Sequence, residues 1–219
     1  EGLVNIVTSQ EKKEITIPLA ERLNREFANI GTIVNNITSR KASFSFGEKE
    51  TVLSGPGFIR DRIGDYDFQV SANSFFQTNT SCAKRLYEKV VEYAELSGKE
   101  TVVDLYCGTG TIPIFLASGA REIIGVEIVE SAVSDAIRNC RENNIDNCSF
   151  ILGDIRERMD DLRQKPDVII IDPPRAGMHK DIPAKIMDMG VNKVVYVSCN
   201  PATMARDVNA MLEKYEIVE

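Results

Sequence analysis

Residues 101–111 read T-V-V-D-L-Y-C-G-T-G-T, and this stretch decides the fold. The apolar run at 101–104 predicts a short buried strand that ends at its aspartate. Gly108 and Gly110 follow, and glycines at such positions let the backbone approach a ligand while the next helix points its N-terminus at it. A full dinucleotide fingerprint has a third glycine at position 113, where this chain has Pro113. Proline suits the first turn of a helix, so we predict a strand, a ligand-binding loop and a helix. Because the third glycine is missing, we predict no pyrophosphate cradle.

The same alternation of strand and helix continues along the rest of the sequence. Apolar runs predict strands at 101–104, 122–126, 149–152, 167–171 and 193–198. Helical periodicity predicts helices at 112–117, 131–142, 155–162, 182–189 and 202–214. The run V-I-I-I at 168–171 has no polar interruption, as expected of a strand that is covered on both faces. These observations predict an α/β fold with a doubly wound, mostly parallel sheet.

Acidic residues and a cysteine stand at the carboxyl ends of these predicted strands. Glu127 ends the second strand, where a carboxylate can bind ribose hydroxyls, and Asp154 follows the third, where it can accept a hydrogen bond from an adenine amino group. Asp172 ends the fourth strand and Cys199 the fifth. Any one of them alone is more often a cap or a turn residue. Because the carboxyl ends of parallel strands share one edge, together they indicate an adenosine ligand without a pyrophosphate, and S-adenosylmethionine fits.

Cys199 lies in the stretch V-V-Y-V-S-C-N-P-A-T at 194–203. The apolar residues predict a short buried strand, and Asn200 and Pro201 end it. A cysteine in such a place can be a small buried hydrophobe. It can also be a nucleophile, because the partial positive charge of the following helix N-terminus can lower the pKa of a thiol and favour the thiolate. These residues alone leave both interpretations open.

The first part of the chain contains short predicted strands and one predicted helix. Strands are expected at 3–8, 32–38, 51–53, 58–63 and 66–70, separated in part by glycine-containing turns. Residues 17–28 predict an amphipathic helix with Leu19, Leu23 and Phe27 in one stripe. We therefore expect a small β-rich α+β accessory region at 1–74, followed by the ligand-binding domain at 75–219.

Two adjacent phenylalanines, Phe75 and Phe76, precede the next predicted helix, at 81–96. Exposed aromatic rings beside amides can hold a nucleobase by stacking and by hydrogen bonds to its edge. Alternatively, both rings belong to the core, and Asn79 or Thr80 caps the helix. The residues do not decide between these two interpretations.

The composition of the 219-residue chain excludes some classes of site and leaves the partner open. Its five cysteines form no C-x-x-C pair and His179 is the only histidine, so we predict no metal site and no Ser-His-Asp triad. No apolar run approaches about 20 residues and no signal-peptide pattern opens the chain, so we predict a cytoplasmic protein without a membrane partner. The net charge of −7 argues at first against a nucleic-acid partner, but charge alone does not decide this.

Six motifs occur in order along the chain. They are F-F-Q-T-N-T, D-L-Y-C-G-T-G-T, G-V-E, G-D, D-P-P-R-A-G and S-C-N-P-A-T, at 75–80, 104–111, 125–127, 153–154, 172–177 and 198–203. In this combination the chain resembles the RNA uracil-5-methyltransferases, which make 5-methyluridine in 23S ribosomal RNA or in the T-loop of tRNA. The resemblance covers about 30–219, and the bacterial 23S rRNA branch is the most similar. It implies a Rossmann-like class I methyltransferase domain that acts on RNA, with 23S rRNA as the expected partner.

The resemblance also implies roles for individual residues. The nucleophile matches Cys199, whose thiolate would add to C6 of a flipped-out uridine, so that C5 takes the methyl group of S-adenosylmethionine and S-adenosylhomocysteine remains. A general base would then remove the C5 proton, and elimination would free the cysteine. Thr111 departs from the asparagine often found in relatives and gives a shorter polar contact. The implied cofactor residues are Gln77, Tyr106, Gly108, Gly110, Thr111, Glu127, Asp154 and Asp172, and the implied substrate residues are Phe75, Phe76, Asp172, Pro173, Arg175 and Asn200.

Some parts of the family pattern have no match in this sequence. The family's general base is a glutamate beyond the S-C-N-P helix, and we do not give that role to Glu219. An oligonucleotide-binding-like domain and, in some relatives, an iron–sulfur cluster precede the matching part. We therefore expect a C-terminal fragment, which binds the cofactor weakly or moderately and turns over poorly or not at all. We also expect a monomer.

Two other functions stay open at this point. A methyltransferase that acts on an exocyclic amine of adenine or guanine can also use D-P-P at a strand end, but it needs no cysteine, so its activity would survive Cys199→Ala. A non-catalytic module that holds RNA or the cofactor would bind RNA tightly and never form a covalent adduct.

Overall fold

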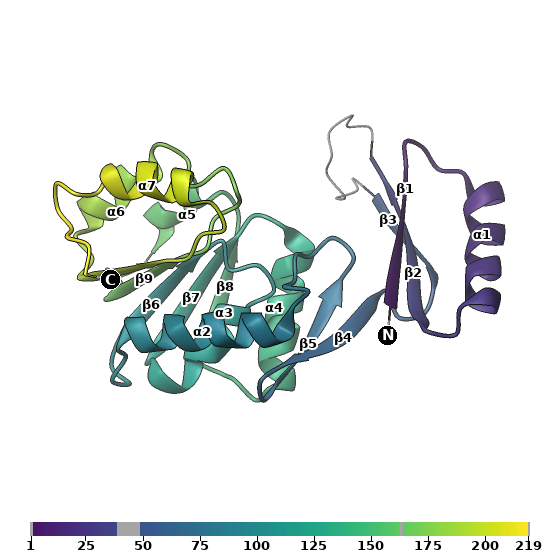
Figure 1. The fold of residues 1–219 in the computed structure, drawn as a ribbon, viewed down its shortest axis with the longest axis horizontal. Coiled ribbons are helices and arrows are strands. Elements are labelled where there is room, and N and C mark those ends of the chain that lie inside the picture. Colours follow the sequence, from purple (N-terminus) through teal and green to yellow (C-terminus); the bar gives the residue numbers. More distant parts are fainter. Residues whose placement is uncertain (1, 39–48, 163, 219) are drawn as a thin grey trace.

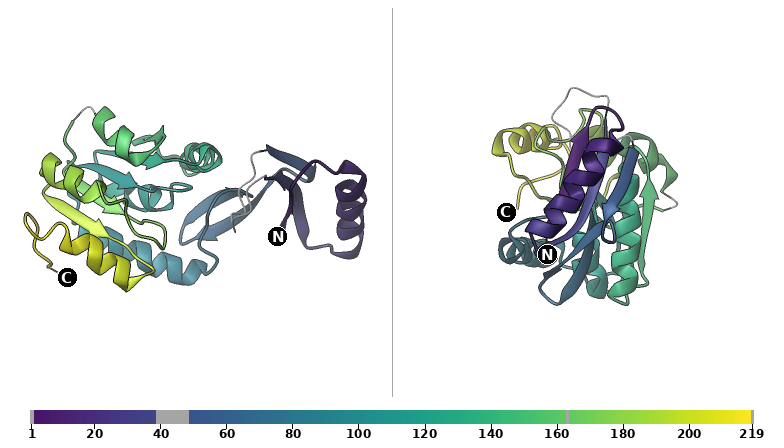
Figure 2. Two further views of the ribbon diagram at one scale, coloured as in Figure 1. Left: turned by 90° about the horizontal axis from the view of Figure 1, so that it is seen from above. Right: turned by 90° about the vertical axis from the view of Figure 1, so that its right-hand side faces the viewer.

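The structure is a computed structural model, and it describes residues 2–38, 49–162 and 164–218. Figure 1 shows a smaller N-terminal part beside a larger α/β part, with a two-stranded hairpin between them. The left-hand view in Figure 2 shows the same elongated arrangement, with the N-terminus in the smaller part and the C-terminus in the larger one.

The larger part is built on a five-stranded parallel sheet. Its strands are β6 (Thr101–Leu105), β7 (Glu122–Glu127), β8 (Cys148–Leu152), β9 (Val168–Ile171) and β10 (Lys193–Tyr196), in the order β10-β9-β6-β7-β8. The chain runs from β6 outward to β8 and then crosses to β9 on the other side of β6. The strand order therefore reverses beside β6, which is where open α/β sheets bind their ligands. The predicted doubly wound parallel sheet is confirmed.

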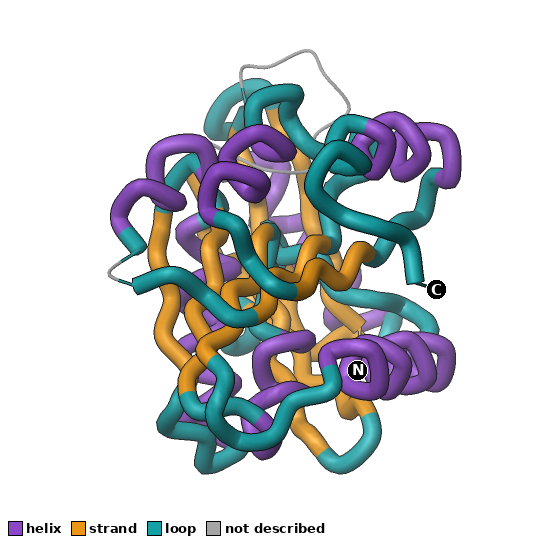
Figure 3. The backbone as a smooth tube through the Cα atoms, turned by 90° about the vertical axis from the view of Figure 1, so that its left-hand side faces the viewer, coloured by secondary structure: helices purple, strands orange, loops and turns teal. Residues whose placement is uncertain are grey.

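Helices cover both faces of this sheet, and Figure 3 shows the strands in orange between purple helices. One face packs against α2 (Thr80–Ala94), α3 (Thr111–Leu116) and α4 (Glu130–Glu142), with the short 3-10 helix η1 (Ala117–Gly119) after α3. The other face packs against α5 (Ile155–Arg158), the 3-10 helix η2 (Met159–Asp161), α6 (Ile182–Met189) and the turn that follows α7 (Pro201–Asn209).

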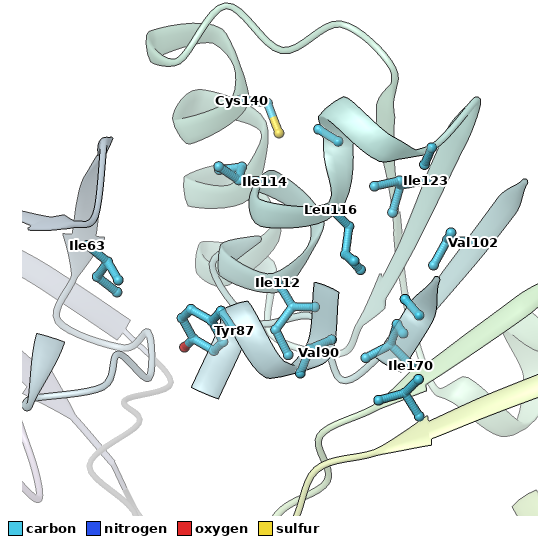
Figure 4. Packing of buried hydrophobic residues seen from close by; sticks show 14 of the residues in the cluster. Ile63, Tyr87, Val90, Val102, Ile112, Ile114, Leu116, Ile123, Cys140 and Ile170 are labelled. Carbon is cyan, nitrogen blue, oxygen red and sulfur yellow. The ribbon is translucent and has the colours of Figure 1, made fainter. Parts of the chain in front are cut away.

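Successive strand residues fill these two layers alternately. Val102 and Ile170 belong to the layer with α2, α3 and α4, and Figure 4 shows both among the side chains of that layer. Val103 and Ile171 point to the opposite layer. All four are at most 1% exposed, and burying such a side chain stabilises the fold by about 1.5–3 kcal/mol. This two-sided burial explains why the strands have few polar residues before their carboxyl ends.

Two predicted elements end earlier than the sequence indicated. The last strand was expected to reach residue 198 but ends at Tyr196, because Ser198 Oγ accepts a hydrogen bond of 3.0 Å from Asn200 N and turns the chain out of the sheet. The helix expected at 202–214 ends at Asn209. The helix expected at 155–162 is divided into α5 and η2.

The N-terminal part is a separate three-stranded sheet with one helix. It contains β1 (Gly2–Thr8), α1 (Lys13–Glu26), β2 (Ile30–Ile37) and β3 (Lys49–Ser54), with β1 parallel to β2 and β3 antiparallel to it. The apolar stripe predicted for α1 does not form its buried face. Leu19 and Phe27 are 40% and 49% exposed, whereas the smaller Thr16 and Ala20 are buried.

The hairpin of β4 (Phe58–Ile63) and β5 (Tyr66–Ser71) packs on the α/β part. Phe68 is fully buried in the same cluster as the side chains of α2 and α3. On α4, Asp135 Oδ2 accepts a 2.8 Å hydrogen bond from Ser71 N, and Asn139 Oδ1 accepts one of 2.7 Å from Gln69 N. The hairpin therefore shares the larger core, and the domain boundary placed at 74/75 stays a prediction.

Among the described residues, no helix combines the length and the apolar character needed to span a bilayer.

Candidate active site

A cavity of about 420 Å³ lies at the carboxyl ends of the parallel strands. Residues at or after the carboxyl ends of four of the five strands line it: Tyr106, Glu127, Ile128, Asp154, Ile155, Arg156, Pro174, Ala176, Gly177, Met178, His179 and Ile182. This lining brings together three predicted cofactor residues, namely Tyr106, Glu127 and Asp154. The other predicted cofactor residues lie outside the lining: Gln77, Gly108, Gly110, Thr111 and Asp172.

The loop after β6 turns sharply at Tyr106. Its φ of +69° lies in the left-handed region, which is uncommon for a residue with a side chain and is often found at functional sites. Hydrogen bonds from Tyr106 N (3.0 Å) and Cys107 N (3.2 Å) to Val126 O hold this turn against β7. Gly110 has a φ of +79°, and a Cβ there would lie 3.0 Å from the Cβ of Ala136 on α4. The second glycine is thus needed both for the backbone conformation and for close packing.

Glu127 fastens the same loop from the end of β7. Its Oε2 accepts a 3.0 Å hydrogen bond from Gly108 N, and its Oε1 accepts bonds of 2.8 and 2.9 Å from Ile128 N and Val129 N. A carboxylate has about four acceptor positions, so these three bonds leave capacity for a further donor such as a hydroxyl. Glu127 lines the cavity, as a ribose-binding carboxylate must.

Asp154 caps α5 and forms an ion pair with Arg156 beside the cavity. Its Oδ1 accepts hydrogen bonds of 2.9 Å from both the backbone N and the Nε of Arg156. The hydrogen bond from the Arg156 side chain is the main reason that the pKa of Asp154 falls to about 2. Asp154 is therefore anionic at neutral pH, and Arg156 occupies part of its acceptor capacity.

Asp104 is a candidate site residue to which the sequence assigned no role. It is fully buried at the end of β6, and neither of its carboxylate oxygens has a hydrogen-bond partner among the described residues. Burial, followed by the charges of Asp172 and Glu127, raises the pKa of Asp104 well above its usual range. A buried carboxyl without partners is costly, which fits a group that accepts hydrogen bonds from a bound ligand. The only signal in the sequence was an acidic residue in an apolar strand, directly before the glycine loop.

Asp172 and Thr111 lie beside this edge, outside the cavity lining. Burial raises the pKa of Asp172 to about 6. Thr111 Oγ1 donates a 3.2 Å hydrogen bond to the hydroxyl of Tyr87 on α2. Burial also raises the pKa of Tyr87 to about 12, so the hydroxyl stays protonated at neutral pH. Thr111 thus contacts α2, and its predicted contact with a cofactor stays a prediction.

The two phenylalanines before α2 have different environments. Phe75 is 70% exposed, whereas the ring of Phe76 packs against Phe68 with centroids 5.7 Å apart. Ser74 Oγ donates a 2.8 Å hydrogen bond to Asp135, which anchors the segment that carries them. Asn79 is the helix cap, since its side chain accepts a 3.0 Å hydrogen bond from Cys82 N. Phe76 therefore belongs to the core and Phe75 does not, and the stacking of a nucleobase on Phe75 stays a prediction.

Cys199 is exposed and lies directly before the N-terminus of α7, as predicted. Asn200 Oδ1 caps this helix by accepting a 3.1 Å hydrogen bond from Ala202 N, and Asn200 Nδ2 donates a 3.1 Å bond to Arg175 O. The Cys199 turn is thus joined to the D-P-P-R-A-G loop that walls the cavity. Within that loop Pro173 is buried and the Arg175 side chain is exposed.

Within the described residues, no group of three or more His, Cys, Asp or Glu side chains is arranged to hold a metal ion.

The parallel sheet, the glycine loop after β6 and the polar strand ends define the Rossmann-like class I methyltransferase fold. Residues 58–219 match the sequence profile of the family described as tRNA (Uracil-5-)-methyltransferase. The chain therefore belongs to this family, as the six motifs indicated.

Similar proteins support the same family. An uncharacterized RNA methyltransferase of Chlorobaculum tepidum is 44% identical over 94% of this chain and 44% of its own length, and one of Halalkalibacterium halodurans is 42% identical over 96% and 47%. A crystal structure of the Pyrococcus abyssi tRNA (uracil-54, C5)-methyltransferase with S-adenosyl-L-homocysteine is 33% identical, has a TM-score of 0.74 and covers 99% of this chain and 51% of its own. The chain thus spans about half the length of these relatives.

Proposed function

We propose that this protein is an S-adenosylmethionine-dependent RNA methyltransferase that methylates C5 of a uridine through a covalent bond between Cys199 and C6. The observation that carries the proposal is a hydrogen bond between two segments. One segment contains Cys199, and the other is the loop at 172–179 that forms one wall of the cavity. Asn200, next to Cys199, donates a hydrogen bond to the loop whose other residues line the cavity. Such a reaction requires a nucleophile that is held in a fixed position relative to the cofactor pocket, and this hydrogen bond joins the two segments that carry them.

The residues around the cavity fit S-adenosylmethionine. Glu127 and Asp154 offer carboxylate oxygens for the ribose and the adenine amino group, and Ile128 offers an exposed apolar side chain at the rim for the adenine ring. Asp104 does not line the cavity but is buried at the end of β6 without a partner among the described residues, and we assign it the hydrogen bonds from the ammonium group of the methionine part. Once bound, this cofactor supplies an electrophilic methyl group on a sulfonium and becomes S-adenosylhomocysteine.

Cys199 would supply the nucleophile for the RNA side of the reaction. Addition of its thiolate to C6 of uracil converts C5 from a poor nucleophile into an enolate-like carbon that can accept the methyl group. Loss of the C5 proton to a base and elimination of the thiolate then restore the double bond and free Cys199. Glu219 lies outside the described residues, and no role is assigned to it. Phe75 is exposed and could stack on a flipped-out base. We assign Pro173, Arg175 and Asn200 to the substrate side of the site, supported by the hydrogen bond from Asn200, the neighbour of Cys199, to Arg175 O.

We further propose a uridine of 23S rRNA as the target and a monomeric protein, on the strength of the motif resemblance. The Pyrococcus abyssi relative, by its name, acts on uridine 54 of tRNA, so tRNA is the competing substrate. Methylation assays with both RNAs would separate the two branches of the family.

The activity is tested by nucleoside analysis of RNA after incubation with S-adenosylmethionine. We expect 5-methyluridine from the unmodified full-length protein and none from Cys199→Ala. Cys82→Ala is the matched control, because Cys82 is also an exposed cysteine and lies on α2 away from the cavity. Activity that survives Cys199→Ala and yields a methylated amine on adenine or guanine would replace this proposal with the amino-methyltransferase. RNA binding without any methylation would identify a non-catalytic module.

A further inference from the structure

The loop at 172–179 lies between the cofactor cavity and the turn that carries Cys199, and it contacts both. Five of its residues line the cavity: Pro174, Ala176, Gly177, Met178 and His179. At Arg175 its carbonyl oxygen accepts hydrogen bonds from Asn200 Nδ2 (3.1 Å) and Thr203 Oγ1 (3.4 Å), both at the start of α7. Any shift of this loop would move the cavity wall relative to Cys199.

A buried carboxylate on α7 holds the far end of this loop. Asp207 is 3% exposed, and its Oδ2 accepts hydrogen bonds of 2.7 Å from the backbone N of Met178 and 2.7 Å from the hydroxyl of Tyr196 on β10. Its Oδ1 accepts bonds of 2.8 and 2.6 Å from Arg206 Nε and Nη2. One side chain therefore ties together the loop, the last strand and the helix.

Arg206 extends this network along the loop backbone. Its Nη2 also donates to Ala176 O at 3.0 Å and to Met178 O at 3.3 Å. Between these residues, Gly177 has a φ of +80°, and a Cβ there would lie 2.5 Å from Arg206 Nη2 and 2.6 Å from Asp207 Oδ2. The loop thus passes so close to the Arg206–Asp207 pair that only glycine fits.

We propose that Asp207 and Arg206 are positioning residues that fix the loop at 172–179 against α7, so that the cofactor cavity and Cys199 keep one relative geometry. This inference rests on the proposed function, since it assigns the network to methyl transfer onto a base held by Cys199. Neither side chain lines the cavity, so their effect is exerted through the loop. A displacement of about 1 Å at reacting atoms can cost about a hundredfold in rate, which gives such a network a strong effect on the chemical step.

The test compares variants of the full-length protein in single-turnover methylation of RNA at saturating S-adenosylmethionine. Asp207→Asn keeps the shape of the side chain but loses its charge against Arg206. We expect the single-turnover rate constant to fall by at least about tenfold, while the protein concentration that gives half of the maximal rate changes by less than about twofold, because only the transition-state geometry is disturbed. Arg206→Gln should give the same pattern without endangering the core, since the Arg206 side chain is 57% exposed. Asp188→Asn, at an 85% exposed side chain on α6, should leave the rate unchanged.

A pair of glycine variants separates positioning from backbone strain. Gly177→Ala should slow the reaction as Asp207→Asn does. Gly98→Ala introduces an alanine at a similar φ of +90°, where a Cβ would meet nothing within 4 Å, and should lower only the melting temperature. Rates equal to that of the unmodified protein in Asp207→Asn, Arg206→Gln and Gly177→Ala would overturn the inference.

The failure of this inference can be told apart from a failure of the proposed function. If the unmodified protein makes 5-methyluridine and these variants do so at the same rate, the positioning role alone is wrong. If the Cys199→Ala variant still methylates RNA, the proposed function is wrong. In that case the positioning network is tested by equilibrium binding of S-adenosylhomocysteine, which Arg206→Gln, outside the cavity lining, should weaken and Asp188→Asn should not. Equal affinities in that measurement would overturn the network as well.

Discussion

Replacing Asp172 by asparagine should stabilise the ligand-free protein at neutral pH, although it removes a proposed site residue. Burial raises the pKa of Asp172 from 3.8 to about 6. The unfolded chain therefore ionises first as the pH rises, and the folded state loses stability between about pH 4 and pH 6 and does not regain it above. The interval between 3.8 and about 6 corresponds to about 3 kcal/mol, because one pKa unit is worth about 1.4 kcal/mol. Asparagine has no charge to bury and avoids this cost.

The assay is urea unfolding of the ligand-free protein at pH 7.5 and at pH 4. We expect Asp172→Asn to be more stable than the unmodified protein by about 3 kcal/mol at pH 7.5 and by less than about 1 kcal/mol at pH 4. For a chain of this size the larger difference corresponds to a rise in melting temperature of about 6–12 °C. The control Asp188→Asn, with an 85% exposed side chain, should show no difference at either pH. An equal effect of Asp172→Asn at both pH values, or destabilisation at pH 7.5, would refute the reasoning.

Three further substitutions, one of them with a matched glycine control, have defined outcomes. Glu127→Ala removes the acceptor that fastens Gly108 and should weaken S-adenosylhomocysteine binding by at least about tenfold in calorimetry, with an unchanged affinity counting against its role. Gly110→Ala places a Cβ 3.0 Å from that of Ala136 and should lower the free energy of unfolding by about 1–3 kcal/mol; Gly108→Ala, where a Cβ meets nothing within 4 Å, should cost less. Asn79→Ala removes the cap of α2 and should lower the free energy of unfolding, measured in urea, by about 1 kcal/mol. An unchanged free energy of unfolding would show that this cap does not stabilise the helix.

The parallel sheet could be predicted because its signal is local. Four consecutive apolar residues at Val168–Ile171 report burial on both faces, and the glycines after β6 report a tight turn. The α1 helix shows where this reasoning fails. Periodicity placed Leu19 and Phe27 in an apolar stripe, but it could not indicate that the sheet would instead receive the smaller Thr16 and Ala20. The packing partner of a helix face is a tertiary property, and it decides which face is buried.

The site could be predicted only where its residues follow directly from the local sequence pattern. Glu127 and Asp154 could be placed because they directly follow strands whose carboxyl ends meet at one edge. The isolation of Asp104 from hydrogen-bond donors among the described residues could not be foreseen, because it depends on which side chains approach β6 from other segments. The hydrogen bond between Asp207 and Met178 N joins residues far apart in the sequence, and no local pattern encodes it. Likewise, Phe76 is packed and Phe75 is exposed because Phe68 of the hairpin contacts only the ring of Phe76 among these two.

The central claim is that Cys199 forms a covalent bond to the RNA base. The most direct measurement is the intact mass of the full-length protein after incubation with S-adenosylmethionine and RNA that contains 5-fluorouridine. Fluorine at C5 prevents the final proton loss, so the covalent intermediate should accumulate and peptide mapping should place it on Cys199. Cys82→Ala should form the adduct and Cys199→Ala should not. Methyl transfer to unmodified RNA by a protein that never forms this adduct would contradict the account.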